Sequence, residues 1–259
     1  VKPIEPVFLD FKKDMSQLTA KSDIPVLYKQ NTTNDLFQLI YVFDMGNNND
    51  KALGTAFDYL EYLGTSDMTP EELKSEFYRL ACTFYVSPGN ERTYVVLSGL
   101  NENMPAAMQL FEKLLADAQV NKEAYNNLVG DILKARADAK LNQGQNFSRL
   151  MNYAMYGPKS PATNLLTEAE LASMNPQELV DRIHNQNNYK HRILYYGPSS
   201  SKDLLATIEQ YHQVPATLKD IPAGNEYSYL ETPATKVLVA PYEAKQIYMA
   251  QISNLDKKY

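Results

Sequence analysis

The chain has 259 residues, of which 44% are apolar and 22% are charged, and this balance excludes a disordered or fibrous protein. Its formal charge of −6, with acidic and basic residues interspersed, offers no basic stripe for phosphates, so nucleic acid is not an expected partner. No apolar run approaches the roughly 20 residues that span a bilayer. We expect a soluble protein without a membrane span, and both the periplasm and the cytoplasm remain open as its compartment.

Few side chains of the sequence are suited to binding a transition metal. The single cysteine, Cys82, lies in an alternating apolar stretch and is interpreted as a small buried hydrophobe. The histidines are His184, His191 and His212, which are scattered and which we interpret as ordinary surface or strand-end residues. This inventory excludes a zinc cage built from cysteine and histidine.

The first part of the chain predicts two strands and two helices after a lead-in of about 20 residues. The apolar runs 24–30 and 36–46 flank a cluster of turn-forming residues, which predicts a hairpin. Apolar residues at helical spacing then predict a helix over 50–63. A second helix is expected to begin at Thr69, where Pro70 and an acidic residue at the third helical position complete a capping box.

The middle of the chain predicts a second hairpin followed by a long helical region. Residues 82–87 and 93–100 are rich in β-branched and aromatic side chains and flank the turn PGNE. Helices are expected over 105–118, 121–142 and 145–156, and two further capped helices are expected to begin at Thr167 and Asn175. A last strand over 191–197 and a last helix from Ser201 to His212 follow. This order lacks regular βαβ alternation and predicts an α+β fold, with helices packed on one face of a mostly antiparallel sheet.

The composition changes after residue 213. Prolines and a glycine interrupt residues 214–235, and no hydrophobic period survives there, which predicts a linker. Residues 236–253 then resume a strand, turn and strand pattern similar to that of residues 24–43. We therefore expect one domain over residues 1–213, a linker over 214–235, and the first strands of a similar following domain over 236–259.

The stretch GNNNDKALGTAFDYLEYLGTSDMTPEEL, residues 46–73, resembles the signature region of M16 (pitrilysin/insulinase-type) metallopeptidases. In that family a strand ends in a glycine turn and the next helix carries the zinc motif H-x-x-E-H. Laid onto this helix, the motif places Asp58 and Tyr62 at the two histidine positions and Glu61 at the position of the general base. The third family ligand is a glutamate on a later helix, and its best counterpart here is Asp131.

The residues at these degenerate positions predict neither a zinc site nor a catalytic residue in this segment. A tyrosine phenol is a poor zinc ligand at neutral pH because its proton leaves at a pKa of about 10. Two carboxylates and a tyrosine would also be an atypical zinc set. The plainer interpretation is that Asp58, Glu61 and Tyr62 form the polar edge of an amphipathic helix.

The order of elements from about residue 20 to residue 212 is also similar to that of the M16, or mitochondrial-processing-peptidase-like, fold. The resemblance implies a non-catalytic domain of a zinc metalloendopeptidase that helps to enclose an unfolded peptide substrate. It also implies that zinc is held by a catalytic half, either in the same chain or in a partner subunit. The alternative is a purely structural subunit resembling the core proteins of respiratory complexes. An independent hydrolase that uses Glu61 is disfavoured, because nothing near it in the sequence supplies a metal or a nucleophile.

Overall fold

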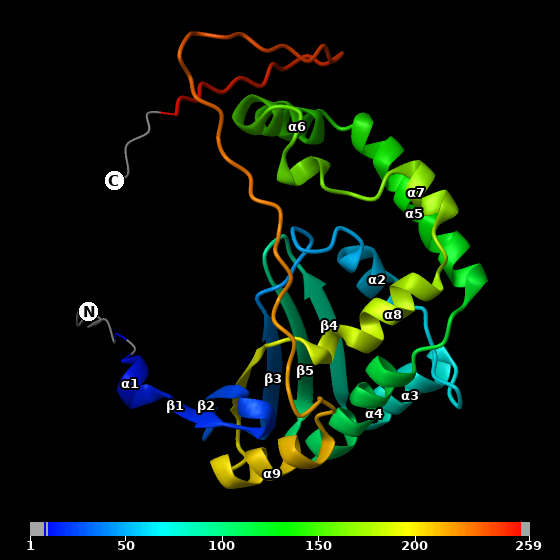
Figure 1. Ribbon diagram of the computed structural model, residues 1–259, viewed down its shortest axis with the longest axis vertical. Helices are drawn as coiled ribbons and strands as arrows, with labels where there is room; N and C mark the ends of the chain where they lie inside the picture. Colours follow the sequence, from blue (N-terminus) through cyan, green and yellow to red (C-terminus); the bar gives the residue numbers. More distant parts are fainter. Residues whose placement is uncertain (1–7, 9, 255–259) are drawn as a thin grey trace.

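Six strands form one mixed sheet in the order β1-β2-β6-β3-β5-β4 (Figure 1). The computed structural model describes residue 8 and residues 10–254. The strands are β1 (Ser16–Thr19), β2 (Pro25–Gln30), β3 (Leu36–Phe43), β4 (Cys82–Pro88), β5 (Thr93–Leu100) and β6 (Arg192–Gly197). The neighbours β2 and β6 run parallel, whereas the other four neighbouring pairs are antiparallel. The expected α+β fold with a mostly antiparallel sheet is therefore confirmed.

The strands β2 and β3 do not form the hairpin that the sequence predicts. Strand β6 lies between them, so that Tyr195 faces Tyr28 of β2 on one side and Leu39 of β3 on the other. The turn-forming cluster after β2 reverses the chain, with the Asn31 side chain accepting a hydrogen bond from the Thr33 backbone N–H (2.9 Å). A cluster of turn-forming residues predicts that the chain reverses direction. It does not predict whether the two strands pair directly or with a third strand between them. The second predicted hairpin, β4 with β5, is confirmed.

Helices cover one face of this sheet (Figure 1). Alternate residues of β3, namely Phe37, Leu39, Tyr41 and Phe43, point into the core beneath these helices. The α-helices are α1 (Phe11–Asp14), α2 (Leu53–Leu60), α3 (Pro70–Arg79), α4 (Met104–Asp117), α5 (Lys122–Lys140), α6 (Gln143–Tyr156), α7 (Glu168–Ser173), α8 (Gln177–Asn185) and α9 (Ser201–Tyr211). The described residues also contain four 3-10 turns: η1 (Lys21–Asp23), η2 (Asn101–Asn103), η3 (Pro161–Thr163) and η4 (Gln186–Asn188). Helices α5, α6 and α7 form an arm that curves away from the sheet.

The start of α3 follows the sequence prediction closely, whereas α2 is shorter than predicted. Thr69 and Glu72 form the expected capping box, with each side chain bonded to the other residue's backbone N–H. Helix α2 begins at Leu53, and not at residue 50, because the Asp50 side chain turns back to accept a hydrogen bond from the Ala52 backbone N–H (3.0 Å). Within the described part of the chain, no helix has the length and apolar character to cross a membrane.

Residues 213–235 run over the surface in extended form. Lys219 forms a parallel bridge with Tyr189 just before β6. Further along, the Asn225 N–H donates to the Asn48 carbonyl (2.7 Å), and the Leu230 N–H donates to the Met155 carbonyl of α6 (2.7 Å). The segment is thus attached in turn to the sheet layer, to the loop before α2 and to the helical arm.

The strands expected over residues 236–253 are not formed. From residue 236 to residue 254 the described chain is extended but pairs with no strand. It packs on α6, as in the edge-to-face contact of Tyr248 with Phe147 (ring centroids 5.6 Å apart), and the Tyr242 hydroxyl donates to the Leu141 carbonyl at the end of α5. An isolated two-stranded ribbon is marginal in water, so a strand pattern without a sheet edge to join stays unpaired. The domain division at residue 213 and the following domain remain predictions, and residues 1–7, 9 and 255–259 lie outside the described part.

Candidate functional site

The degenerate motif lies at the C-terminal end of α2. The apolar side of this helix, which includes Phe57 and Leu60, is buried against the core. Asp58 projects from the opposite side and is exposed, Glu61 is the exposed C-cap residue, and the Tyr62 ring is 44% exposed. The structure therefore places these three side chains on the polar edge of an amphipathic helix, at the solvent boundary.

Two carboxylates, those of Asp58 and Glu61, lie close together on this polar edge. The pKa of Asp58 is raised, first because neighbouring protein atoms displace part of its water and second because of the negative charge of Glu61. Asp131 lies on the exposed side of α5. Among the residues that the structure describes, no three histidine, cysteine, aspartate or glutamate side chains gather as metal ligands, so Asp131 does not join Asp58 and Glu61 in such a set.

A residue inside the motif, Tyr59, connects α2 to the start of α5. Its fully buried side chain donates a hydrogen bond to the Asn121 carbonyl (2.6 Å) and accepts one from the Asn121 N–H (2.9 Å). Its ring also packs edge-to-face on Tyr125, with centroids 5.8 Å apart. This role of Tyr59 was not predicted from the sequence, although Tyr59 follows Ala56 by three residues and so belongs to the buried stripe. Tyr59 fixes the motif helix relative to the helix that would carry a third ligand.

Changing Tyr59 to phenylalanine is expected to lower the free energy of unfolding by about 1 to 3 kcal/mol, because it leaves both backbone groups of Asn121 without their partner. Urea denaturation followed by circular dichroism measures this loss. The matched control is Tyr62→Phe on the same helix end, where the exposed hydroxyl predicts a change within about 0.5 kcal/mol. Equal effects of the two changes would contradict the bridging role of Tyr59.

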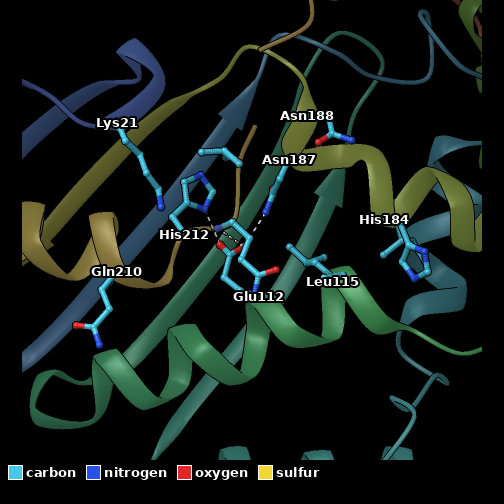
Figure 2. A pocket seen from close by; sticks show the side chains of 12 residues that line it. Lys21, Glu112, Leu115, His184, Asn187, Asn188, Gln210 and His212 are labelled. Atoms are coloured by element: carbon cyan, nitrogen blue, oxygen red, sulfur yellow. Dashed lines mark hydrogen bonds and ion pairs between the residues drawn. The ribbon is translucent and has the colours of Figure 1, made fainter. Parts of the chain in front are cut away.

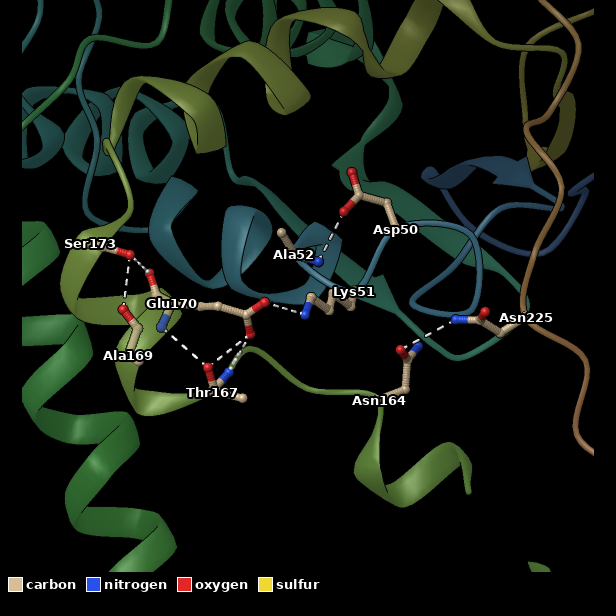
Figure 3. Close-up of polar contacts among 9 residues, drawn as sticks. All are labelled: Asp50, Lys51, Ala52, Asn164, Thr167, Ala169, Glu170, Ser173 and Asn225. Carbon is tan, nitrogen blue, oxygen red and sulfur yellow. Dashed lines mark hydrogen bonds and ion pairs between the residues drawn. The ribbon is translucent and has the colours of Figure 1, made fainter. Parts of the chain in front are cut away.

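The loop before α2 is held by the helices α7 and α8, and Figure 3 shows its contact with α7. Asp50 accepts a hydrogen bond from Arg182 of α8 (2.7 Å), and Lys51 pairs with Glu170 of α7 (2.5 Å). The pKa of Glu170 is lowered to about 2, first by Lys51 and then by hydrogen bonds from Thr167. Both ion pairs are partly exposed and stabilise the fold only modestly. Their role is to orient the loop, because they join it to two separate helices.

A second polar cluster lies in the core, built from Glu112 of α4, His212 at the end of α9, and His191 before β6. Figure 2 shows Glu112 and His212. The His212 Nδ1 atom is 2.6 Å from Glu112 Oε1, and His212 Nε2 is 2.9 Å from His191 Nε2. Glu112 and His212 are fully buried, and His191 is 7% exposed. The prediction that these histidines are ordinary surface or strand-end residues is therefore wrong for His212, whereas His191 does lie at the start of a strand but is buried. His184 is half-buried and lies apart, with its Nε2 3.1 Å from the Ala118 carbonyl oxygen.

The hydrogen-bond partners determine where the protons of this cluster lie. The Tyr189 carbonyl can only accept, so His191 Nδ1, at 2.7 Å, carries the proton that it donates. In neutral His191 the Nε2 atom is then an acceptor, and His212 Nε2 must donate to it. The remaining proton is shared between His212 Nδ1 and Glu112. Since Glu112 also accepts hydrogen bonds from Tyr41, Asn187 and the Gln213 N–H, this arrangement favours a carboxylate and an imidazolium.

Burial changes the acidity of the groups around this pair. The pKa of His191 falls to about 4, chiefly because burial disfavours its charged form and further because of the neighbouring His212. The pKa of Tyr41 lies well above its usual value, first through burial and then through Glu112. One sequence signal could have found this cluster: Glu112 follows Met108 by four residues and precedes Leu115 by three, which puts a carboxylate on the apolar face of α4. A charge in that position requires a buried partner.

An open cavity of about 480 Å³ borders the cluster (Figure 2). Glu112, His212 and Asn187 form part of its wall, and Lys21 of η1 lies at its edge. The Lys21 amine is bound to the Glu209 carbonyl of α9 (2.7 Å). The buried pair therefore lies in the wall of this open cavity, at the point where α9 ends and the surface segment begins.

Comparison with known proteins gives a structural result only. No family model and no curated protein sequence matches the chain. Among solved structures, the periplasmic protease PqqL from Escherichia coli is similar with a TM-score of 0.74 and 15% identity over 88% of this chain and 26% of that one. A mutant of the ferredoxin protease FusC, in complex with Arabidopsis ferredoxin, is similar with a TM-score of 0.71 and 12% sequence identity. The match covers 87% of this chain and 25% of FusC. An inactive M16 peptidase domain from Pseudomonas fluorescens is similar with a TM-score of 0.68 and 16% sequence identity. The match covers 82% of this chain and 54% of that one.

These similarities concern the fold, because the identities are low. The chain spans about a quarter of PqqL and of FusC and about half of the Pseudomonas protein. The structural match covers most of the sheet and helical layer described above. The chain therefore has the fold of an M16-like domain, a fold that the inactive M16 domain shares. The resemblance of its motif region implies the same fold.

Proposed function

We propose that this chain is a non-catalytic M16-type domain that forms part of the wall of a peptide-binding chamber. In this proposal the zinc and the general base belong to a catalytic M16 half, which is either in the same protein or in a partner subunit. The domain contributes binding surface and chamber closure, which can supply positioning energy without supplying a nucleophile.

The observation that carries the proposal is the state of the motif helix. The proposed alignment with the M16 motif makes α2 the counterpart of the zinc helix and puts Asp58 and Tyr62 at the two histidine positions. Glu61, at the position of the base, is an exposed C-cap residue. A general base needs a metal-bound water or a substrate proton within hydrogen-bond reach, and these side chains provide no imidazole to hold a metal.

A purely structural M16-like subunit is the second candidate. It would share the fold and the degenerate motif, and it would associate with partner subunits without taking part in proteolysis. The two candidates differ in one measurable respect, which is whether peptide cleavage by the assembled protein depends on this domain.

The chain itself is expected to hold less than about 0.1 zinc per molecule after dialysis, because both imidazoles of the motif are replaced. Metal analysis of the purified protein measures this, and the double variant Asp58→His with Tyr62→His provides the matched comparison. We expect that variant to gain weak zinc affinity and no peptide hydrolysis, since it lacks a supported third ligand. One tightly held zinc in the unaltered chain, lost on Glu61→Gln, would contradict the proposal.

In the assembly with its catalytic half, Glu61→Gln is expected to change peptide cleavage by less than about twofold. A general base contributes about a hundredfold or more, so the two cases are well separated. Removing this domain from the assembly should instead abolish the cleavage of long peptides while the catalytic half keeps its zinc. Undiminished cleavage without the domain would favour the structural subunit, and a hundredfold loss on Glu61→Gln would make Glu61 a working catalytic residue.

A further inference from the structure

We propose that Glu112, His212 and His191 form a pH-dependent latch that holds residues 213–219 against the domain and releases them when His191 is protonated. This inference rests on the buried cluster and is independent of the proposed function.

The latch holds the surface segment at two points. At the first, the Gln213 N–H donates to Glu112 Oε2 (3.1 Å), directly after His212. At the second, the Lys219 N–H donates to the Asn188 carbonyl (2.8 Å), and the Lys190 N–H donates to the Lys219 carbonyl (2.9 Å). The residue enclosed by this second pair of bonds is Tyr189, whose carbonyl accepts the His191 Nδ1 proton. His191 therefore joins both points, through His212 on one side and through Tyr189 on the other.

A positive charge on both rings is incompatible with this geometry. His191 already donates through Nδ1, and its Nε2 must accept from His212 Nε2 at 2.9 Å. Protonation would make both nitrogens donors, so that two N–H groups would face each other across that distance. His212 could lose its Nε2 proton and still donate from Nδ1 to Glu112, so the conflict arises only while His212 stays an imidazolium, the state that the donors around Glu112 favour. Separation of the two rings relieves the conflict, and His212 is the ring attached to the surface segment.

The groups packed around His191 come from several elements, and of these burial and His212 lower its pKa. His212, at the end of α9, is the nearest titratable group, and Tyr41 of β3 lies beside both rings (centroids 5.9 Å from His191 and 4.3 Å from His212). Phe43 of β3 covers the His191 ring at 4.6 Å. Glu112 of α4 reaches His191 only through His212. Lys21 of η1 adds a positive charge at the edge of the cavity.

The direction of the pH effect follows from these surroundings. The pKa of His191 is about 4 in the latched state, whereas a released, hydrated histidine titrates near 6.5. Above pH 6.5 both states carry neutral His191, and the latch has its full stability. Between pH 6.5 and pH 4 only the released state takes up the proton, so release becomes progressively more favourable as the pH falls. Because the pKa of His191 differs in this way between the two states, the opening equilibrium can shift by up to roughly 300-fold.

Hydrogen exchange followed by mass spectrometry on the full chain, from pH 7 to pH 4, tests this inference. After correction for intrinsic exchange rates, we expect protection of residues 213–219 to fall by roughly 100-fold or more, while β5 stays protected. In His191→Gln, whose side-chain oxygen can accept from His212 but cannot be protonated, this loss should be absent. His184→Gln removes one histidine outside the cluster and should behave like the unaltered protein.

Equal loss of protection in His191→Gln and in the unaltered chain would overturn the proposal, as would protection of residues 213–219 that does not change with pH. Simultaneous loss of protection in β5 would mean acid unfolding of the whole domain, and it would overturn the proposal as well. If His191→Gln does not fold, the NMR titration of the His191 ring in the unaltered protein decides. Titration near pH 4 together with loss of protection supports the latch, and titration near pH 6.5 without that loss refutes it.

Discussion

Replacing Glu112 with alanine is expected to lower the free energy of unfolding at pH 7 by about 3 to 5 kcal/mol, which is a large part of the stability of a domain of this size. The change leaves the His212 ring buried without its carboxylate, and it removes the acceptor for Tyr41, Asn187 and the Gln213 N–H. Each orphaned buried donor costs free energy, because water cannot reach it. Urea denaturation gives the value directly.

Glu209→Ala is the matched control for Glu112→Ala, because Glu209 is an exposed glutamate on a helix, α9, of the same layer. Its change is expected to stay within about 0.5 kcal/mol. Glu112→Gln separates charge from shape, since it keeps the volume but cannot balance an imidazolium. Losses of less than about 1 kcal/mol for both Glu112 variants would show that the buried pair is not what holds α9 to α4.

Changing Gly46 to alanine is expected to destabilise the protein by about 1 to 3 kcal/mol. A methyl group at this position would lie 2.4 Å from the Gly89 carbonyl oxygen and 2.5 Å from the Asn90 carbonyl oxygen, both in the turn between β4 and β5. These atoms cannot move freely, because they accept hydrogen bonds from the Asn47 and Asn48 N–H groups (2.9 and 2.8 Å). The close backbone approach sets the course of the loop that leads into α2.

Gly130→Ala is the same type of substitution and is expected to have the opposite effect on stability. Gly130 lies inside α5 with open space around its α-carbon, so alanine is expected to stabilise the protein by about 0.5 to 1 kcal/mol through its higher helix propensity. Thermal and urea unfolding of both variants should therefore show shifts of opposite sign. Shifts of the same sign would contradict the account of the Gly46 contact.

Local signals predicted the elements of this fold better than their arrangement. The capping box at Thr69 and the apolar period of α4 act within one turn of chain, and the structure confirms both elements. The place of β6 depends on pairing between residues more than 150 positions apart, such as Val26 and Ile193, and a single sequence carries no direct record of that pairing. The hairpin error over residues 24–46 has this cause.

In the candidate site, too, local sequence patterns predicted some features, whereas contacts between distant residues were not predicted. The polar edge of α2 follows from helical spacing, so the exposed positions of Asp58, Glu61 and Tyr62 agree with the sequence pattern. The buried cluster brings together Glu112, His191 and His212 from three separate elements. An isolated histidine in a sequence looks the same on a surface and in a core, and only the inward position of Glu112 on α4 indicated that it needed a partner.

The position of β6 between β2 and β3 also has a consequence for synthesis on the ribosome. Strands β3, β4 and β5 can pair as soon as residue 100 has emerged, because each lies next to its partner and is nearby in sequence. The β1–β2 ribbon cannot join them until residues 192–197 have also emerged, since β6 is its only link to the rest of the described sheet. During that interval one edge of β3 and one edge of β2 expose unpaired backbone groups. The nascent chain is therefore most vulnerable to strand-mediated aggregation while it builds its helical arm, and slowing translation between residues 104 and 191 should prolong that vulnerable stage.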